Sequence, residues 1–286
     1  MRGGGGTIVL TALAMIAFAA NSILCRMALA DPLIDPASFT SVRIASGAAA
    51  LALIVAFRAE GGVNQLFKAG DWRAAAALFA YAIAFSLAYV SLGASTGALI
   101  LFGVVQVTMI AAGLARGERL SRLQTTGAAA AVAGLVYLLS PGLAAPPLLP
   151  ALLMAAAGVA WGAYSLIGRR AQRGDPTLVT AGNFLRAAPM ALIPLALVPL
   201  ALSPTGVALA VASGAITSGV GYAVWYTALK GLSASEAAIV QLTVPAIAAA
   251  AAIAFLDEAL SLRFVLASAA IIGGVAIVLT AKRQPA

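Results

Sequence analysis

The segment Gly117-Glu118-Arg119-Leu120-Ser121 returns in altered form 140 residues later as Asp257-Glu258-Ala259-Leu260-Ser261. Each copy follows an alanine-rich apolar run and precedes a final apolar run that contains glycine, Gly134 in one case and Gly273-Gly274 in the other. A motif that recurs with matching surroundings indicates an internal repeat. The 286-residue chain is therefore predicted to consist of two related halves, residues 1–142 and residues 147–286.

Two further matches extend the repeat toward the start of each half. The pattern Phe39-Thr-Ser-Val-Arg43 resembles Gly182-Asn-Phe-Leu-Arg186, and Ala17-Phe18-Ala-Ala-Asn-Ser22 resembles Ala160-Trp161-Gly-Ala-Tyr-Ser165. Because both ends of each half match, we expect the whole of each half to follow one plan.

Composition places both halves in a membrane. The chain is 63% hydrophobic and 9% charged, whereas soluble proteins carry about 25% charged residues. A bilayer-spanning helix needs about 20 mostly apolar residues, and ten such runs fit between polar or Pro/Gly breaks. They are residues 7–29, 37–57, 72–92, 97–114, 122–139, 150–168, 178–202, 206–229, 235–256 and 262–280. We predict an all-α integral membrane protein with ten transmembrane helices and no separate soluble domain.

The loop charges indicate how these helices face. One side receives thirteen Lys and Arg residues: Arg2, Arg58, Lys68, Arg73, Arg116, Arg119, Arg122, Arg169, Arg170, Arg173, Lys230, Lys282 and Arg283. The other side receives only Arg263. Under the positive-inside rule both termini are cytoplasmic, so the net charge of +8 encodes orientation in a bacterial inner membrane rather than nucleic-acid binding.

Five helices per half is an odd number, so two tandem copies must insert in opposite orientations. The charges agree, because residues 116–122 hold three arginines and the related residues 256–262 hold none. We therefore expect two inverted five-helix repeats. The alternative is that residues near Arg2 begin a signal peptide cleaved after Ala28-Leu29-Ala30, which would leave nine spans.

Several classes of function are disfavoured by missing side chains. The chain has no histidine and only Cys25, so His-based catalysis, His or Cys metal sites and intrachain disulfides are absent. We predict no catalytic residue, no metal and no cofactor. An integral-membrane enzyme acting on a lipid-linked substrate stays as an alternative, but Glu118 is the only acid in the polar cluster 116–122. An ion channel or a scaffold is also left open.

At this point the sequence resembles a known family. The five-plus-five plan, the Gly-Glu-Arg-Leu-Ser motif at 117–121, its counterpart at 257–261 and Pro245 in the ninth span look like the drug/metabolite transporter superfamily with two EamA-type repeats. The likeness covers essentially the whole chain and is closest to amino-acid exporters of the YddG type, including those for aromatic amino acids. One departure is Gln106, which stands near the place in the fourth span where the repeat would put the counterpart of Pro245.

Polar and aromatic residues at mid-depth are the candidates for a transport site, because leucine and alanine suit lipid and protein alike. We expect a central cavity between the first, third, fourth, sixth, eighth and ninth spans, with aromatic rings against an apolar side chain and amides against a polar end. The predicted substrate-binding residues are Phe18, Asn21, Tyr81, Phe85, Phe102, Gln106, Trp161, Tyr164, Tyr222, Gln241 and Thr243. Helix packing would produce similar aromatic rows at Tyr81, Phe85 and Tyr89 and at Tyr222 and Tyr226.

Other notable residues are given structural roles. Trp72 and Trp225 are interpreted as anchors in the interfacial aromatic belt, and Arg26 as a side chain that snorkels to the outer surface. Gly214, Thr217, Ser218 and Gly221 are expected to permit close helix packing. Arg43 and Arg186 match in the repeat and are interpreted as ties to a loop or a helix end, with a substrate carboxylate as the alternative partner.

The resulting prediction is a secondary transporter, and from the resemblance an exporter, of small amphipathic metabolites such as amino acids, working by alternating access. Its partners are that small-molecule substrate and the lipid bilayer. Sugar phosphates, nucleotide sugars and cationic drugs are the alternative cargoes, although mid-depth cation pairs and carboxylates are missing. Because no Asp or Glu lies in the middle of a span, we expect facilitated diffusion or weak proton coupling, with Glu236 as the exception.

Overall fold

The computed structural model describes residues 5–58, 64–117, 119–142, 144–170, 175–232 and 234–281. Within these ranges the chain is helical, and an isolated bridge between Ile34 and Leu202 is the single extended pairing. The elements are α1 (Gly5–Ala30), α2 (Pro36–Arg58), α3 (Asn64–Lys68), α4 (Trp72–Tyr89), α5 (Ala94–Leu114), α6 (Arg122–Leu139), α7 (Leu148–Arg170), α8 (Pro176–Ala191), the 3-10 turn η1 (Pro194–Ala196), α9 (Pro204–Val211), the π-helix η2 (Ala212–Val220), α10 (Gly221–Leu229), α11 (Ala234–Gln241), α12 (Thr243–Leu256) and α13 (Leu262–Thr280).

Nine of the described helical segments are long and apolar enough to cross a membrane. The remaining candidate is α6, which has 18 residues, carries polar side chains in its first turn and packs along α13. The described chain is thus an all-helical protein with nine to ten candidate spans, in agreement with the composition.

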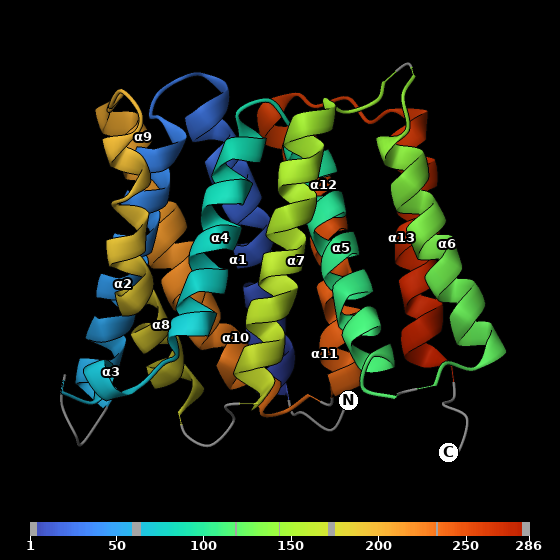
Figure 1. Cartoon of the computed structure of the whole chain (residues 1–286), viewed down its shortest axis with the longest axis horizontal. Helices are drawn as coiled ribbons and strands as arrows, with labels where there is room; N and C mark the ends of the chain where they lie inside the picture. Colours follow the sequence, from blue (N-terminus) through green and yellow to red (C-terminus); the bar gives the residue numbers. More distant parts are fainter. Residues whose placement is uncertain are drawn as a thin grey trace.

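The bundle is elongated, with α2, α8 and α9 at one edge and α6 and α13 at the other (Figure 1). The remaining long helices fill the middle. In the same view α1 begins and α13 ends at one end of the bundle. The helices α3, α5 and α10 also end there, and α4 and α6 begin there. We call this the basic end, because the residues at or beside these helix ends include Lys68, Arg73, Arg116, Arg119, Arg122 and Lys230. Arg2, Glu60, Glu118, Arg173, Lys282 and Arg283 lie outside the described residues, as do the side chains of Arg58, Arg169 and Arg170.

The polar breaks seen in the sequence serve as helix caps. The Ser121 hydroxyl accepts the Gln124 amide while the Gln124 side chain accepts the Ser121 amide, which is a capping box at the start of α6. Ser261 caps α13 in the same position of its motif. These caps satisfy amides that have no partner inside the helix. They explain why the predicted spans 122–139 and 262–280 coincide with the observed α6 and α13.

Glu258, in the second copy of the motif, caps a helix far away in the sequence. One carboxylate oxygen accepts the Ala94 amide at 2.5 Å, and the other accepts the Ser95 amide at 3.1 Å and the Ser95 hydroxyl at 2.7 Å. The local N-cap residue of α5 is Gly93, which has no side chain to do this. The motif therefore joins the α12–α13 loop to the start of α5.

Three spans differ from prediction for identifiable reasons. The predicted span 178–202 ends as an α-helix at Ala191, because Pro189 and Pro194 remove amide donors, and η1 follows. The short helix α3 was not predicted. The ninth span divides into α11 and α12 at Leu242, since Pro245 has no amide to bond the Gln241 carbonyl. Its counterpart α5 runs unbroken through Gln106, as the absence of proline there predicts.

The eighth span contains the π-helix η2 between α9 and α10. Here Gly214 lies against α2: a Cβ at this position would collide with the Arg43 carbonyl and the Ser46 hydroxyl. Any larger residue would push η2 away from α2. The sequence prediction of close packing at Gly214 is confirmed, but the π-helical geometry was not predicted.

Candidate functional site

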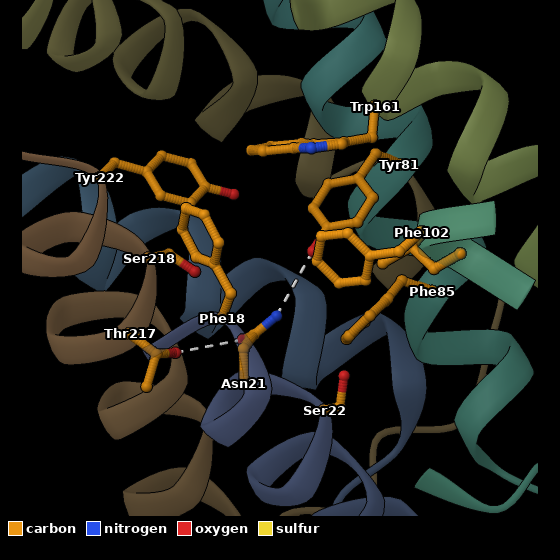
Figure 2. A pocket seen from close by; sticks show the side chains of 11 residues that line it. Phe18, Asn21, Ser22, Tyr81, Phe85, Phe102, Trp161, Thr217, Ser218 and Tyr222 are labelled. Carbon is orange, nitrogen blue, oxygen red and sulfur yellow. Dashed lines mark hydrogen bonds between the residues drawn. The ribbon is translucent and has the colours of Figure 1, made fainter. Parts of the chain in front are cut away.

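A buried pocket lies at mid-depth among α1, α4, α5, α7, η2 and α10 (Figure 2). Its cavity is about 20 Å³, which is room for about one water molecule. Aromatic rings form most of its wall, and hydroxyl and amide groups lie on the α1 and η2 side. The lining residues are Phe18, Asn21, Ser22, Tyr81, Phe85, Leu101, Phe102, Trp161, Thr217, Ser218 and Tyr222.

Trp161 on α7 closes one side of this pocket. Its ring centroid lies 4.9 Å from that of Tyr81 and 5.2 Å from that of Tyr222, so it bridges α4 and α10. A third ring, Tyr164, stacks on it at 5.4 Å. Because aromatic pairs at these separations attract one another, Trp161 is held in place by three neighbours from three helices. Figure 2 shows its ring lying across the space between Tyr81 and Tyr222.

Asn21 on α1 is the centre of the polar side. Its amide oxygen accepts hydrogen bonds from Ser213 at 2.7 Å and Thr217 at 3.2 Å, both on η2. Its amide nitrogen donates to the Tyr81 hydroxyl at 3.3 Å. One N–H of the amide is left over, because a primary amide has two donors. Asn21 thus joins the two halves and keeps a donor available at the pocket.

The two repeat-matched arginines have different surroundings. Arg186 donates to the Phe67 carbonyl at 2.8 Å, to the Gly182 carbonyl at 3.0 Å and to the Ala69 carbonyl, which ties α8 to the end of α3. This is the structural tie expected from the sequence. Arg43 instead donates to the side chains of Tyr81 at 3.0 Å and Ser218 at 3.3 Å, both of which line the pocket.

Seven of the eleven predicted binding residues line this one pocket: Phe18, Asn21, Tyr81, Phe85, Phe102, Trp161 and Tyr222. Whether they bind a substrate stays a prediction. Ser22, Leu101, Thr217 and Ser218 also line it and were missed. Ser22 directly follows Asn21 in the sequence, and this adjacency could have indicated that it lies at the pocket. Thr217 and Ser218 were interpreted as packing residues.

The other four predicted residues lie elsewhere. Tyr164 is one layer behind the wall, stacked on Trp161 and accepting a hydrogen bond from Asn183. Gln106 is buried, 5% exposed, but does not line the pocket. Gln241 bonds to the Ala237 carbonyl of its own helix, and Thr243 is exposed with its hydroxyl on the Val240 carbonyl. The ninth span therefore contributes no lining residue among those described.

One anchoring prediction needs correction. Trp225 is 7% exposed and packs edge-on against Phe18 at 5.9 Å, so it belongs to the core and not to an interfacial belt. Arg26 is partly buried and donates to the carbonyls of Tyr89 and Val90 at the end of α4, and the bond to Val90 is exposed. Trp72, by contrast, is 60% exposed at the basic end, as a belt residue would be.

A second hollow of about 210 Å³ opens at the basic end between the start of α8 and the end of α10. Its lining includes Asp175, Tyr226 and Lys230. Tyr226 lies one helical turn beyond Tyr222 on α10, so a single stretch of helix separates this hollow from the central pocket.

Fold and site together define a multi-pass, all-helical membrane protein with a buried polar and aromatic pocket at its centre. Residues 148–280 match the EamA-like transporter family, which falls within the drug/metabolite transporter superfamily. This match suggests a membrane transporter of small molecules.

Two similar proteins extend the comparison over the whole chain. The uncharacterized protein PA1977 of Pseudomonas aeruginosa is 51% identical over 275 residues, which cover 96% of this chain and 94% of that protein. A protein of known crystal structure, whose description names no function, has a TM-score of 0.69 and 21% identity over 97% of this chain and 98% of its own. At that identity the likeness shows the fold alone.

Proposed function

We infer that the protein is a secondary transporter that exports small amphipathic metabolites, chiefly amino acids including aromatic ones, by alternating access. The observation that carries this inference is the central pocket, where rings suited to an apolar side chain face hydroxyl and amide groups suited to a polar end. Its lining comes from both halves of the chain, so movement of one half against the other would alter access to it.

Packing at the α6–α13 contact supports two inverted repeats, residues 1–142 and 147–286. Gly134 on α6 approaches Ala267 and Ile271 on α13, and Gly274 on α13 approaches Gly127 and Ala131 on α6. Each residue in the first contact lies 140 positions from its counterpart in the second, the same distance that separates the two copies of the motif. A two-fold axis between the repeats would produce this exchange.

The other helix contacts exchange in the same manner. In the first half α1 packs against α12 and against the segment α9 to α10, and in the second half α7 packs against α5 and α4. Under the repeat α1 corresponds to α7, α5 to α11 and α12, and α4 to the segment α9 to α10. The bundle therefore has the pairings expected of two superimposable halves in opposite orientations.

The small cavity represents a closed arrangement of the transport path. A cavity of about 20 Å³ cannot hold an amino acid, so Trp161 and Tyr222 have to move apart before a substrate enters. Both rings line the pocket, and Tyr226, one turn beyond Tyr222 on α10, lines the hollow at the basic end. By the positive-inside rule that end faces the cytoplasm. Both termini would then lie on the cytoplasmic side of a bacterial inner membrane, and the hollow would be the opening through which an exported substrate enters.

The test is counterflow in proteoliposomes that contain the full chain and unlabelled L-phenylalanine, with uptake of the labelled amino acid as the readout. Trp161→Ala is expected to slow the initial rate by about tenfold or more, because three ring contacts at the pocket are lost. Phe255→Ala is the matched control, since that ring is 72% exposed on α12.

Saturable counterflow with the expected difference between the two variants would support the proposal. Absence of counterflow for every amino acid would refute the substrate class, whereas equal rates for Trp161→Ala and the parent would refute the pocket. Export as the direction is checked in cells, where overproduction should raise resistance to a toxic phenylalanine analogue.

A further inference from the structure

Arg43 is a buried cation at mid-depth without an anionic partner. It is 2% exposed, and no carboxylate of the described residues contacts it. One of its terminal nitrogens, Nη1, is buried without any hydrogen-bond partner. The nearby rings of Tyr81 and Phe85, with centroids 5.2 and 5.0 Å from its central carbon, offer cation–π attraction. Attraction of this kind is weaker than the cost of removing a guanidinium from water, so a missing anion is indicated.

The position of Arg43 relative to the pocket indicates where that anion would come from. Both hydrogen-bond partners of the guanidinium, Tyr81 and Ser218, line the pocket, and so does the Phe85 ring. Tyr81 also accepts from Asn21, which has a further donor of its own. A group that enters between the two hydroxyls would therefore meet a cation, two hydroxyls and an amide N–H.

Arg186 occupies the position in the second half that matches Arg43, and it shows that an arginine at this position can be paired with protein groups. Its guanidinium is satisfied by three backbone carbonyls. Among the described residues, the arginine at the matching place in the first half, Arg43, bonds to pocket side chains and to no backbone carbonyl. The difference between the two arginines is what a specialised ligand contact on one side would produce.

We propose that Arg43 receives the carboxylate of the transported molecule, so that the substrates are monocarboxylates with an apolar or aromatic body, among them zwitterionic amino acids. This rests on the proposed function of the pocket as a transport site. A single guanidinium suits one carboxylate, while a phosphate dianion would call for a second cation. Arg26 is already bound to the carbonyls of Tyr89 and Val90, and the described lysines, Lys68 and Lys230, are at the basic end.

The test compares ligands that share the phenyl side chain and differ in their charged groups. Binding to the purified full chain is measured by calorimetry for L-phenylalanine, for L-phenylalaninamide, which lacks the carboxylate, and for 3-phenylpropionate, which lacks the amine. In the parent protein the amide should bind about tenfold or more weakly than phenylalanine, because a charge-assisted contact is lost. The affinity for 3-phenylpropionate, which retains the carboxylate, should depend on Arg43 as the affinity for phenylalanine does.

Variants assign the effect to the side chain. Arg43→Gln should bring the affinities for phenylalanine and its amide together, Arg43→Lys should keep part of the difference, and Arg186→Gln should keep all of it. If Arg43→Gln does not fold, the affinities of the parent and of Arg43→Lys for phenylalanine and its amide still test the proposal. Equal binding of phenylalanine and its amide in the parent, or an unchanged ratio in Arg43→Gln, would overturn the proposal.

The outcome also separates this proposal from the one above it. Binding of 3-phenylpropionate that depends on Arg43, without binding of any amino acid, would refute the amino-acid substrate and keep the carboxylate site. Binding of phenylalanine that does not depend on Arg43 would do the reverse. Absence of binding by every carboxylate would overturn both.

Discussion

Replacing Glu258 by alanine tests the long-range cap that joins the α12–α13 loop to α5. The change removes the acceptor for two backbone amides, those of Ala94 and Ser95, and for the Ser95 hydroxyl. The start of α5 then has no side-chain cap, because its N-cap residue is Gly93. Loss of an N-cap costs about 0.5–2 kcal/mol, and loss of a negative charge at a helix N-terminus about 0.3–1 kcal/mol.

These two contributions give an expected loss of about 2 kcal/mol in the free energy of unfolding. For chains of this size about 1 kcal/mol corresponds to a change of roughly 2–4 °C in melting temperature, so Glu258→Ala should melt about 4–8 °C below the parent. The assay is a thermal ramp in detergent with a thiol-reactive fluorescent dye. Cys25 is the only cysteine and is fully buried, so the dye reports unfolding directly.

Two variants control for local effects. Glu258→Gln keeps an acceptor oxygen but loses the charge, and its melting temperature should fall between those of the parent and the alanine variant. Asp257→Asn alters the neighbouring residue, which is exposed and has a φ of 51° that asparagine also adopts readily. It should melt with the parent. A melting temperature for Glu258→Ala indistinguishable from that of Asp257→Asn would show that the cap has no energetic role.

Three other predictions concern orientation, pH and coupling. With Cys25→Ser as background, cysteine at exposed Ala259 should react with an impermeant maleimide in intact cells and cysteine at exposed Arg119 should not; the opposite result would invert the topology. These positions are preferable to Ser121 and Ser261, which cap helices. Burial tends to raise the pKa of Asp35, but hydrogen bonds from Ser38 and the amides of Ala201 and Ala37 outweigh it and hold this pKa below its ordinary value. The stability that Asp35 adds is thus present above about pH 4, its unfolded pKa, and is lost as the pH falls through the lower folded pKa. The difference in melting temperature between the parent and Asp35→Asn should therefore be constant from pH 8 to pH 5 and shrink below about pH 4. A difference that grows on acidification would contradict this. Finally, transport should run down the substrate gradient with little proton coupling. Accumulation of substrate that is driven by an imposed pH gradient and abolished by a protonophore would refute this. If that accumulation persisted in Glu236→Gln, Glu236 would be excluded as the proton-coupling residue.

Helix existence and many helix ends were predictable because they depend on local chemistry. The spans beginning at Arg122 and Leu262 were located to the residue, since a serine cap precedes each and an apolar run follows. The distance along a helix indicated which residues lie near the middle of a span. This is why Trp161 and Asn21 were expected at the pocket, and both line it.

The direction in which a side chain points was less predictable, because it depends on how helices rotate against one another. Trp225 lies near the end of its span, and its depth suggested an interfacial position, but the rotation of α10 turns it onto Phe18. Gln241 and Thr243 have suitable chemistry, yet next to the break at Leu242 Gln241 bonds to the Ala237 carbonyl and Thr243 to the Val240 carbonyl, both on α11. Thr217 and Ser218 reach the pocket from a π-helix that no residue pattern indicated.

The π-helix η2 also acts as a register adjustment within the eighth span. A π turn holds more residues than an α turn, so everything beyond η2 is rotated relative to a continuous α-helix. Each residue of an α-helix accounts for about 100° of rotation. Deleting lipid-exposed Ile216, which is 62% exposed, would therefore leave the helix intact but swing Tyr222 away from Phe18 and Trp161. The hydroxyl face and the aromatic face of this span are aligned by a count of residues, so length is as tightly constrained here as side-chain identity.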